Sequence, residues 1–180
     1  MLKELAEIAR PVLEMGYIRR TRRNHGLEHA TIHLLNLKHY RLSGRSTDGG
    51  FVILGNVPTA QVEEAADEAL RRMREGEHGL AVHPNCGTNL VTTGALTTLM
   101  AALALGGRGR KTVIDRFPTA MLLVMFALLF SQPLGLSIQR HFTTEGDPGD
   151  MEILRVTRSE MRLPLRGGRI TMHRVVTHSS

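Results

Sequence analysis

The sequence of 180 residues predicts an α+β protein, a small mixed domain that is interrupted by a two-helix transmembrane hairpin. Residues 90–106 and 117–138 contain no charged residue. As α-helices they would be about 26 and 33 Å long, close to the thickness of the hydrocarbon core of a bilayer. We therefore expect an N-terminal α+β part at 1–89, the hairpin at 90–138, and C-terminal strands at 139–180 that complete the soluble domain.

The N-terminal part begins with two predicted helices. Residues 2–13 carry apolar side chains at helical spacing and are followed by the basic cluster at 19–23. Such an amphipathic helix could lie on a membrane surface or pack on the domain. Residues 21–37 predict a second helix, with Thr21 or Asn24 as its N-cap. It is apolar nearly all round, which indicates a buried helix.

Short strands and one more helix account for the rest of the soluble part. Alternating or apolar segments bounded by turn residues predict strands at residues 40–44, 51–54, 80–83, 152–158 and 169–176. The first two would be joined by the turn-rich segment 45–50. Residues 58–77 predict an amphipathic helix, whose acidic outer face we expect to be solvated.

Composition and charge restrict the partners. The formal net charge is +6, but aromatic residues make up only 4% of the chain and no aromatic-studded basic face is present for stacking bases. We therefore expect a lipid bilayer as partner, together with a membrane-protein partner or a second copy of the chain, and no nucleic acid. Cys86 is the single cysteine, so no intrachain disulfide can form.

The sidedness of the soluble domain is left open by the sequence. The loop at 106–116 contains four Lys or Arg residues, and the positive-inside rule then places this loop in the cytoplasm. The basic cluster at 19–23 instead favours an anionic cytoplasmic surface for the domain itself.

The candidate site is the segment His25-Gly-Leu-Glu28-His29 inside the second helix. Two imidazoles four residues apart lie on one helical face, which suits them to bind one metal ion such as zinc. Glu28 could take a proton from a metal-bound water, or hydrogen-bond a ligating histidine. The alternative is that the two histidines and the glutamate form a hydrogen-bonded cluster in a packed helix.

A third ligand is expected from the polar segment 83–89, HPNCGTN, directly before the first apolar helix. Packed antiparallel helices would bring it near the segment 139–147, which directly follows the second apolar helix. Zinc needs a third protein ligand beyond His25 and His29, and we expect Cys86 or His83 to provide it. The alternative is that HPNCGTN is a tight turn that caps a helix, with Cys86 as a small buried residue.

Two resemblances follow from these motifs. The boxes at residues 24–31 and 83–89, with Ser43-Gly-Arg-Ser46, Pro133-Leu-Gly135 and Thr143-Thr144, resemble an uncharacterised family of small bacterial membrane proteins. This resemblance implies a location in the bacterial cell membrane but no established activity. With the two predicted spans, we expect a multi-pass protein. The five residues from His25 to His29 also resemble the H-x-x-E-H signature of the inverzincin zinc proteases.

The leading hypothesis is a membrane-anchored metal-binding protein, specifically a zinc-dependent hydrolase or peptidase. His25 and His29 would bind zinc, Cys86 or His83 would complete the site, and Glu28 would act as the catalytic general base. The alternative is a non-catalytic membrane scaffold or assembly factor, in which the His/Glu cluster is a buried hydrogen-bond network.

Overall fold

The computed structural model describes residues 2–106, 112–162 and 169–180. Residues 107–111, which are part of the basic loop predicted to lie in the cytoplasm, are outside the described residues. The chain divides into two compact units, of which one contains the residues up to His83 together with Arg140–Ser180 and the other is Pro84–Gln139. Mixed helix and antiparallel sheet confirm the predicted α+β class.

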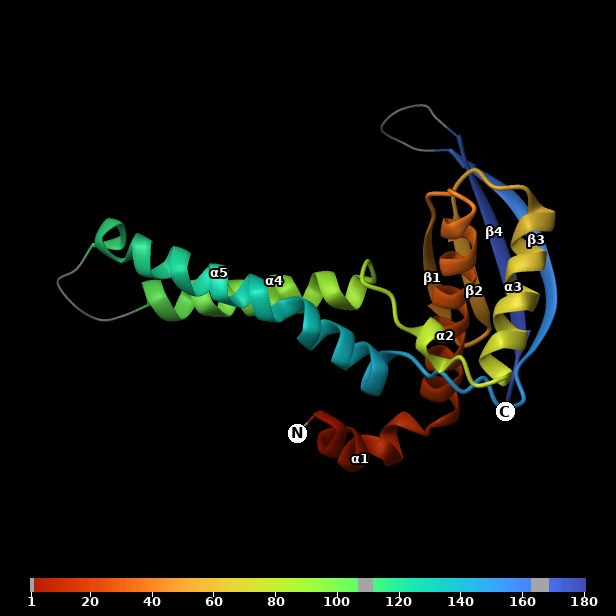
Figure 1. Ribbon diagram of the computed structural model, residues 1–180, viewed down its shortest axis with the longest axis horizontal. Helices are drawn as coiled ribbons and strands as arrows, with labels where there is room; N and C mark the ends of the chain where they lie inside the picture. Colours follow the sequence, from red (N-terminus) through yellow and green to blue (C-terminus); the bar gives the residue numbers. More distant parts are fainter. Residues whose placement is uncertain (1, 107–111, 163–168) are drawn as a thin grey trace. The chain divides into compact units, whose positions relative to one another are not determined.

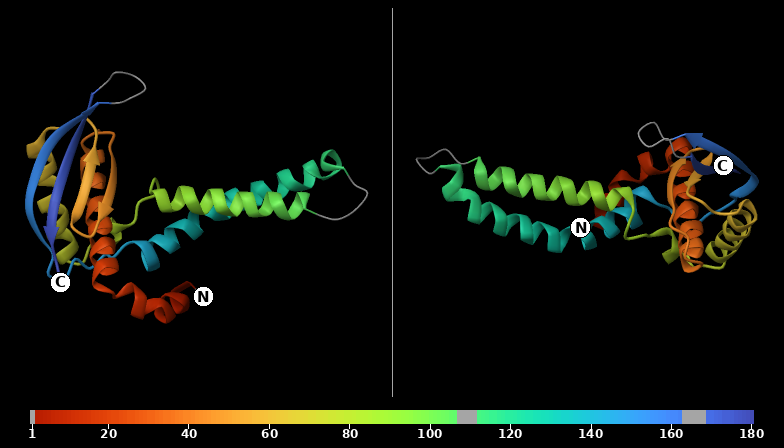
Figure 2. Two further views of the ribbon diagram at one scale, coloured as in Figure 1. Left: turned by 180° about the vertical axis from the view of Figure 1, so that it is seen from behind. Right: turned by 90° about the horizontal axis from the view of Figure 1, so that it is seen from above.

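The first unit is built on a four-stranded antiparallel sheet in the order β1-β2-β4-β3. Its strands are β1 (Ser43–Thr47), β2 (Gly50–Leu54), β3 (Glu152–Arg162) and β4 (Arg169–His178). Helices α2 (Gly16–Leu37) and α3 (Thr59–Arg74) cover one face of this sheet (Figures 1 and 2). The two C-terminal strands predicted from alternation are confirmed as β3 and β4.

The core of the first unit lies between this sheet and its two helices. Its large and almost completely buried apolar side chains include Leu27, Leu35, Phe51, Ile53, Val62, Met73 and Val175. Burying each of them contributes about 1.5–3 kcal/mol. The middle of α2 therefore packs against both α3 and the sheet, as its nearly all-round apolar character indicated.

Two predicted strands are corrected by the structure. β1 begins at Ser43 instead of 40 and includes residues 45–47, which were expected to form a turn. It is an edge strand whose side chains are mostly exposed, and it is held by backbone pairing with β2. Its sequence therefore shows no alternation of apolar and polar residues from which its bounds could be predicted. Residues 80–83 form no strand, because His78–Ala81 is the 3₁₀ helix η1.

The start of α2 also differs from the expectation. Its N-cap is Met15, without a side-chain cap, so neither Thr21 nor Asn24 caps it. The Thr21 hydroxyl donates to the carbonyl of Tyr17 within the helix, at 2.8 Å. The Asn24 amide instead joins the helix to two strand ends: Nδ2 donates to the Thr47 carbonyl at 3.0 Å, and Oδ1 accepts from the Thr177 hydroxyl at 2.6 Å.

The expected N-terminal helix is present as α1 (Leu2–Leu13), and none of its residues is buried. Leu5, Ile8 and Val12 lie on one exposed side of it.

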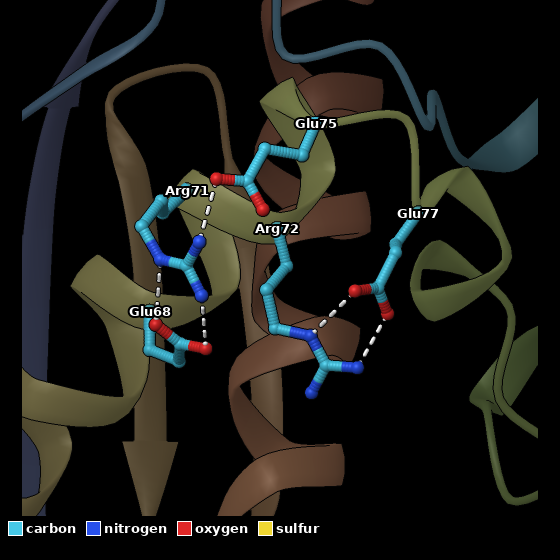
Figure 3. A network of polar contacts seen from close by, with 5 residues as sticks. All are labelled: Glu68, Arg71, Arg72, Glu75 and Glu77. Carbon is cyan, nitrogen blue, oxygen red and sulfur yellow. Dashed lines mark hydrogen bonds and ion pairs between the residues drawn. The ribbon is translucent and has the colours of Figure 1, made fainter.

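The outer face of α3 is charged and exposed, as predicted. Figure 3 shows Arg71 between Glu68 and Glu75, and Arg72 beside Glu77. The Arg71–Glu68 ion pair measures 2.8 Å between Nη2 and Oε1. Because water screens such exposed pairs, they contribute little to stability, and this face carries no sign of a site.

The second unit consists of two antiparallel helices, α4 (Gly87–Leu105) and α5 (Val113–Ile138). Both helices are long and apolar enough to cross a membrane. The buried residues of α5 are all small, which allows close packing of two helices: Ala120, Ala127, Ser131 and Gly135. Helix α5 continues for five residues beyond Pro133, to Ile138.

A buried pair of amides joins the two helices at one end of this unit. The Asn89 amide donates to the Pro84 carbonyl at 2.7 Å and accepts from Gln139 Nε2 at 2.8 Å. A Cβ at Gly135 would overlap the Asn89 amide oxygen, so the closeness of the helices here requires glycine. Paired amides of this kind hold apolar helices together where no water reaches them.

The stability of the first unit is expected to rise with pH through His173. This side chain is fully buried; its Nε2 lies 3.2 Å from the Thr59 hydroxyl, and no group among the described residues forms a hydrogen bond with its Nδ1. Burial first, and the charge of Arg158 second, lower the pKa of His173. The unfolded chain then binds the proton more readily, so stability is complete above about pH 6.5 and falls as the pH drops towards the folded pKa.

Thermal unfolding of the detergent-purified chain at about pH 5.5 and 7.5 measures this effect. His173→Gln should reduce the difference between the two melting temperatures, whereas His178→Gln, at the exposed end of the same strand, should not. Equal pH dependence in wild type and His173→Gln would contradict the role of His173.

Candidate metal centre

The side chains of His25 and His29 are each oriented by a backbone carbonyl. His25 Nδ1 lies 2.9 Å from the carbonyl oxygen of Thr143, and His29 Nδ1 lies 2.8 Å from that of Ala81. Because a carbonyl can only accept, each Nδ1 carries the hydrogen, and in the neutral ring Nε2 then carries the lone pair. Metal-ligating histidines are commonly held in this way, with one nitrogen donating to a carbonyl.

Three imidazoles come together in the first unit. The ring centroids of His25 and His29 are 4.3 Å apart, and those of His29 and His83 are 5.8 Å apart. Burial, and then the charges of His29 and His33, lower the pKa of His83. That shift favours the neutral imidazole, which is the form that binds metals. His33, one turn further along α2, is exposed.

Cys86 caps α4, as the helix-capping interpretation of HPNCGTN predicted. Its buried sulfur accepts from the backbone N–H of Thr88 at 3.4 Å. Cys86 follows His83 by three residues, so chain connectivity alone keeps their Cα atoms within about 11 Å. Within the first unit, His25 and His29 offer two imidazole donors for a metal ion, and these donor types do not fix which metal.

Glu28 lies beside the histidines but is turned towards β1. Its side chain is almost fully buried, and its carboxylate accepts a hydrogen bond from the Ser46 hydroxyl. Burial raises the pKa of Glu28, while the Ser46 hydrogen bond and the charge of His25 act in the opposite direction. Gly44 makes room for the carboxylate, because a Cβ there would overlap Oε1.

Gly44→Ala is therefore expected to displace Glu28 from Ser46 and to lower the free energy of unfolding by about 1–3 kcal/mol, the usual cost of overpacking. Gly49→Ala is the matched control, because it lies in the following turn and a Cβ there would contact nothing. Denaturant unfolding of both variants measures the difference. Equal stability of the two would show that the Glu28 carboxylate can move at no cost.

The other polar residues expected near the site have different roles. Glu145 forms an ion pair with the buried Arg22, at 3.1 Å, and the Asp147 carboxylate accepts from the backbone N–H of Gly149 at 2.9 Å. The carbonyls of Thr143 and Ala81 orient the histidines, and sequence reasoning missed them because a backbone group has no sequence signal.

Residues 20–156 match a protein family described as "Domain of unknown function (DUF6391)". The chain belongs to the DUF6391 family. The matched residues include the candidate metal centre and both apolar helices.

An uncharacterised protein of Picosynechococcus sp. is 34% identical to this chain over 139 residues. The alignment covers 68% of this chain and 65% of the relative, so the DUF6391 chain spans less than two thirds of that protein's length. No solved structure gives a significant match. Because the family description assigns no function, it has no bearing on the resemblance to the inverzincins.

Proposed function

We propose that this DUF6391 protein is a membrane-anchored metalloprotein. His25 and His29 bind the metal through Nε2, and Cys86 or His83 provides the third ligand. The observation that carries the proposal is the pair of hydrogen bonds from the two Nδ1 atoms to the carbonyls of Thr143 and Ala81. They fix one tautomer in both rings, and in that tautomer both Nε2 atoms are donors for a metal.

The membrane anchor is the pair α4 and α5. Both helices have the length and composition of membrane spans, and hydroxyls in both of them bond carbonyls of their own helix, as for Thr92 and Ser131. A hairpin returns the chain to the side from which it came, so two spans place the N-terminal and C-terminal parts of the soluble domain on one side. We assign the protein on this basis to the bacterial cell membrane as a multi-pass protein.

We take zinc as the metal, because imidazole and thiolate are its common protein ligands. With three protein ligands, zinc keeps an open position for water, and the protein is a hydrolase or peptidase in which Glu28 acts as the general base. With four ligands, from His25, His29, His83 and Cys86, the zinc site is closed and structural.

The second candidate function is a non-catalytic scaffold or assembly factor that binds a membrane protein or a second copy of the chain. One observation favours it: Glu28 is enclosed by Gly44 and Ser46 and already accepts a hydrogen bond. A carboxylate in this position can hold α2 on β1 through its hydrogen bond, with no role in catalysis.

Metal analysis of the full chain, purified in detergent, tests the proposal. Wild type should contain stoichiometric metal and His29→Ala should contain none, because the remaining ligands no longer form a site. His33→Ala is the matched control, since it removes an exposed histidine from the next turn of α2 and should keep the metal. Absence of metal from freshly purified wild type, also after incubation with zinc, would leave the scaffold function.

Glu28→Gln separates the hydrolase from a non-catalytic metal protein. It should retain the metal, because Glu28 is not a ligand, and lower the rate of peptide or ester hydrolysis by about 10²–10⁴-fold, the usual contribution of a general base. Turnover equal to that of wild type would remove Glu28 from the catalytic step.

A further inference from the structure

A cavity of about 320 Å³ lies in the first unit, between η1 and the segment that follows α5. Its walls include His78 and Ala81 on one side and Arg140, Thr144 and Asp147 on the other. The volume is at the lower end of the range for small-ligand pockets, so the cavity has room for a compact polar molecule or headgroup.

The two walls of this cavity are held in place by backbone contacts. The N–H of Glu145 donates to the carbonyl of Arg22 at 3.0 Å, which fixes the second wall on α2. A Cβ at Gly146 would lie 2.7 Å from the Cβ of His78, so the two walls approach as closely as they do because residue 146 is glycine. The backbone of both cavity walls is therefore fixed by the fold, and the exposed side chains of Arg140 and Asp147 extend from it.

The charges at the cavity are of both signs. Glu145 also lines it, but its carboxylate is neutralised by Arg22. Among the residues that the structure describes, neither Arg140 nor Asp147 forms an ion pair. The Asp147 carboxylate is oriented by the N–H of Gly149, which occupies Oδ1. The cavity thus offers one guanidinium and one carboxylate to a ligand.

We propose that this cavity binds a zwitterionic phosphate compound of the phosphoethanolamine type. The Arg140 guanidinium pairs with the phosphate, for which its planar set of N–H groups is suited. The Asp147 carboxylate accepts hydrogen bonds from the primary ammonium. Arg140 comes two residues after the end of α5, so when α5 spans a bilayer its chain position is at the level of the lipid phosphates.

The ligand is either free phosphoethanolamine or the headgroup of phosphatidylethanolamine, which present the same phosphate and ammonium groups. If the ligand is the phosphatidylethanolamine headgroup, the proposal rests on the membrane part of the proposed function. It does not depend on a metal at His25 and His29.

Calorimetric titration of the full chain in a maltoside detergent with free phosphoethanolamine tests this site. Binding should be saturable, and Arg140→Gln and Asp147→Asn should each weaken it at least about tenfold, since each removes one charge-assisted contact. Arg155→Gln and Asp67→Asn are the matched controls: both remove exposed charges outside the cavity and should bind as wild type does. Phosphocholine, which has no ammonium N–H, should bind more weakly.

Absence of saturable binding, or binding unchanged in both cavity variants, would overturn the proposal. Reconstitution in phosphatidylcholine nanodiscs, with and without phosphatidylethanolamine, then identifies the source. Competition by the lipid against free phosphoethanolamine supports the headgroup, and unchanged binding supports the free compound. His29→Ala should bind phosphoethanolamine as wild type does, so this site and the metal centre can fail independently.

Discussion

Gly26→Ala is expected to lower the free energy of unfolding by about 2 kcal/mol, although alanine is the better helix former by about 1 kcal/mol. A Cβ at this position would overlap the carbonyl oxygen of Glu145, which is a backbone atom and cannot rotate away. The N–H of the same residue is bonded to the Arg22 carbonyl and its carboxylate to the Arg22 guanidinium. The strain therefore spreads into the segment that carries Thr143.

The same substitution should weaken metal binding about tenfold or more, because the Thr143 carbonyl orients His25 and loss of such a contact usually has this effect. Gly16→Ala is the control in the same helix. The nearest atom to its Cβ is the flexible end of Arg20, at 3.4 Å, so this variant should be as stable as wild type or slightly more stable. Denaturant unfolding and zinc titration measure both effects. Equal stability of the two variants would show that the segment at 143–146 yields freely.

Much of the fold could be predicted because most of its elements carry a regular pattern of apolar residues, which buries one face of the element or makes the whole element apolar. The helical period of α3, the uncharged lengths of α4 and α5, and the alternation in β3 and β4 each determine an element type. The predictions failed where burial does not decide the structure. β1 is an exposed edge strand that depends on backbone pairing with β2, and in the four-residue helix η1 only Ala81 is buried.

The candidate site was predictable only in part, for a related reason. The i, i+4 spacing of His25 and His29 is a property of one helix and can be read from the sequence. Their partners come from positions 118 and 52 residues away in the chain and are backbone carbonyls. The roles of Gly26 and Gly44 follow from what passes close to them, and no local pattern distinguishes them from Gly49, whose surroundings are open.

Removal of the metal by a chelator is expected to destabilise the wild-type protein by about 4 kcal/mol, the effect of losing a ligand present at about a thousand times its dissociation constant. The effect arises because the ligands of the folded chain come from separate segments and are not assembled in the unfolded chain. His29→Ala should show no change with chelator, and His33→Ala should respond as wild type does. A chelator effect of equal size in His29→Ala would place the metal elsewhere in the protein.

The third ligand and the type of site follow from the same measurement on Cys86→Ser and His83→Ala. If one of these variants loses the chelator effect and the other keeps it, the site has three protein ligands and an open position, as a hydrolytic metal requires. If both lose most of it, four protein ligands surround the metal and the site is structural. In the second case Glu28, enclosed by Gly44 and Ser46, would have no metal-bound water to deprotonate, and the scaffold function would account for the chain better.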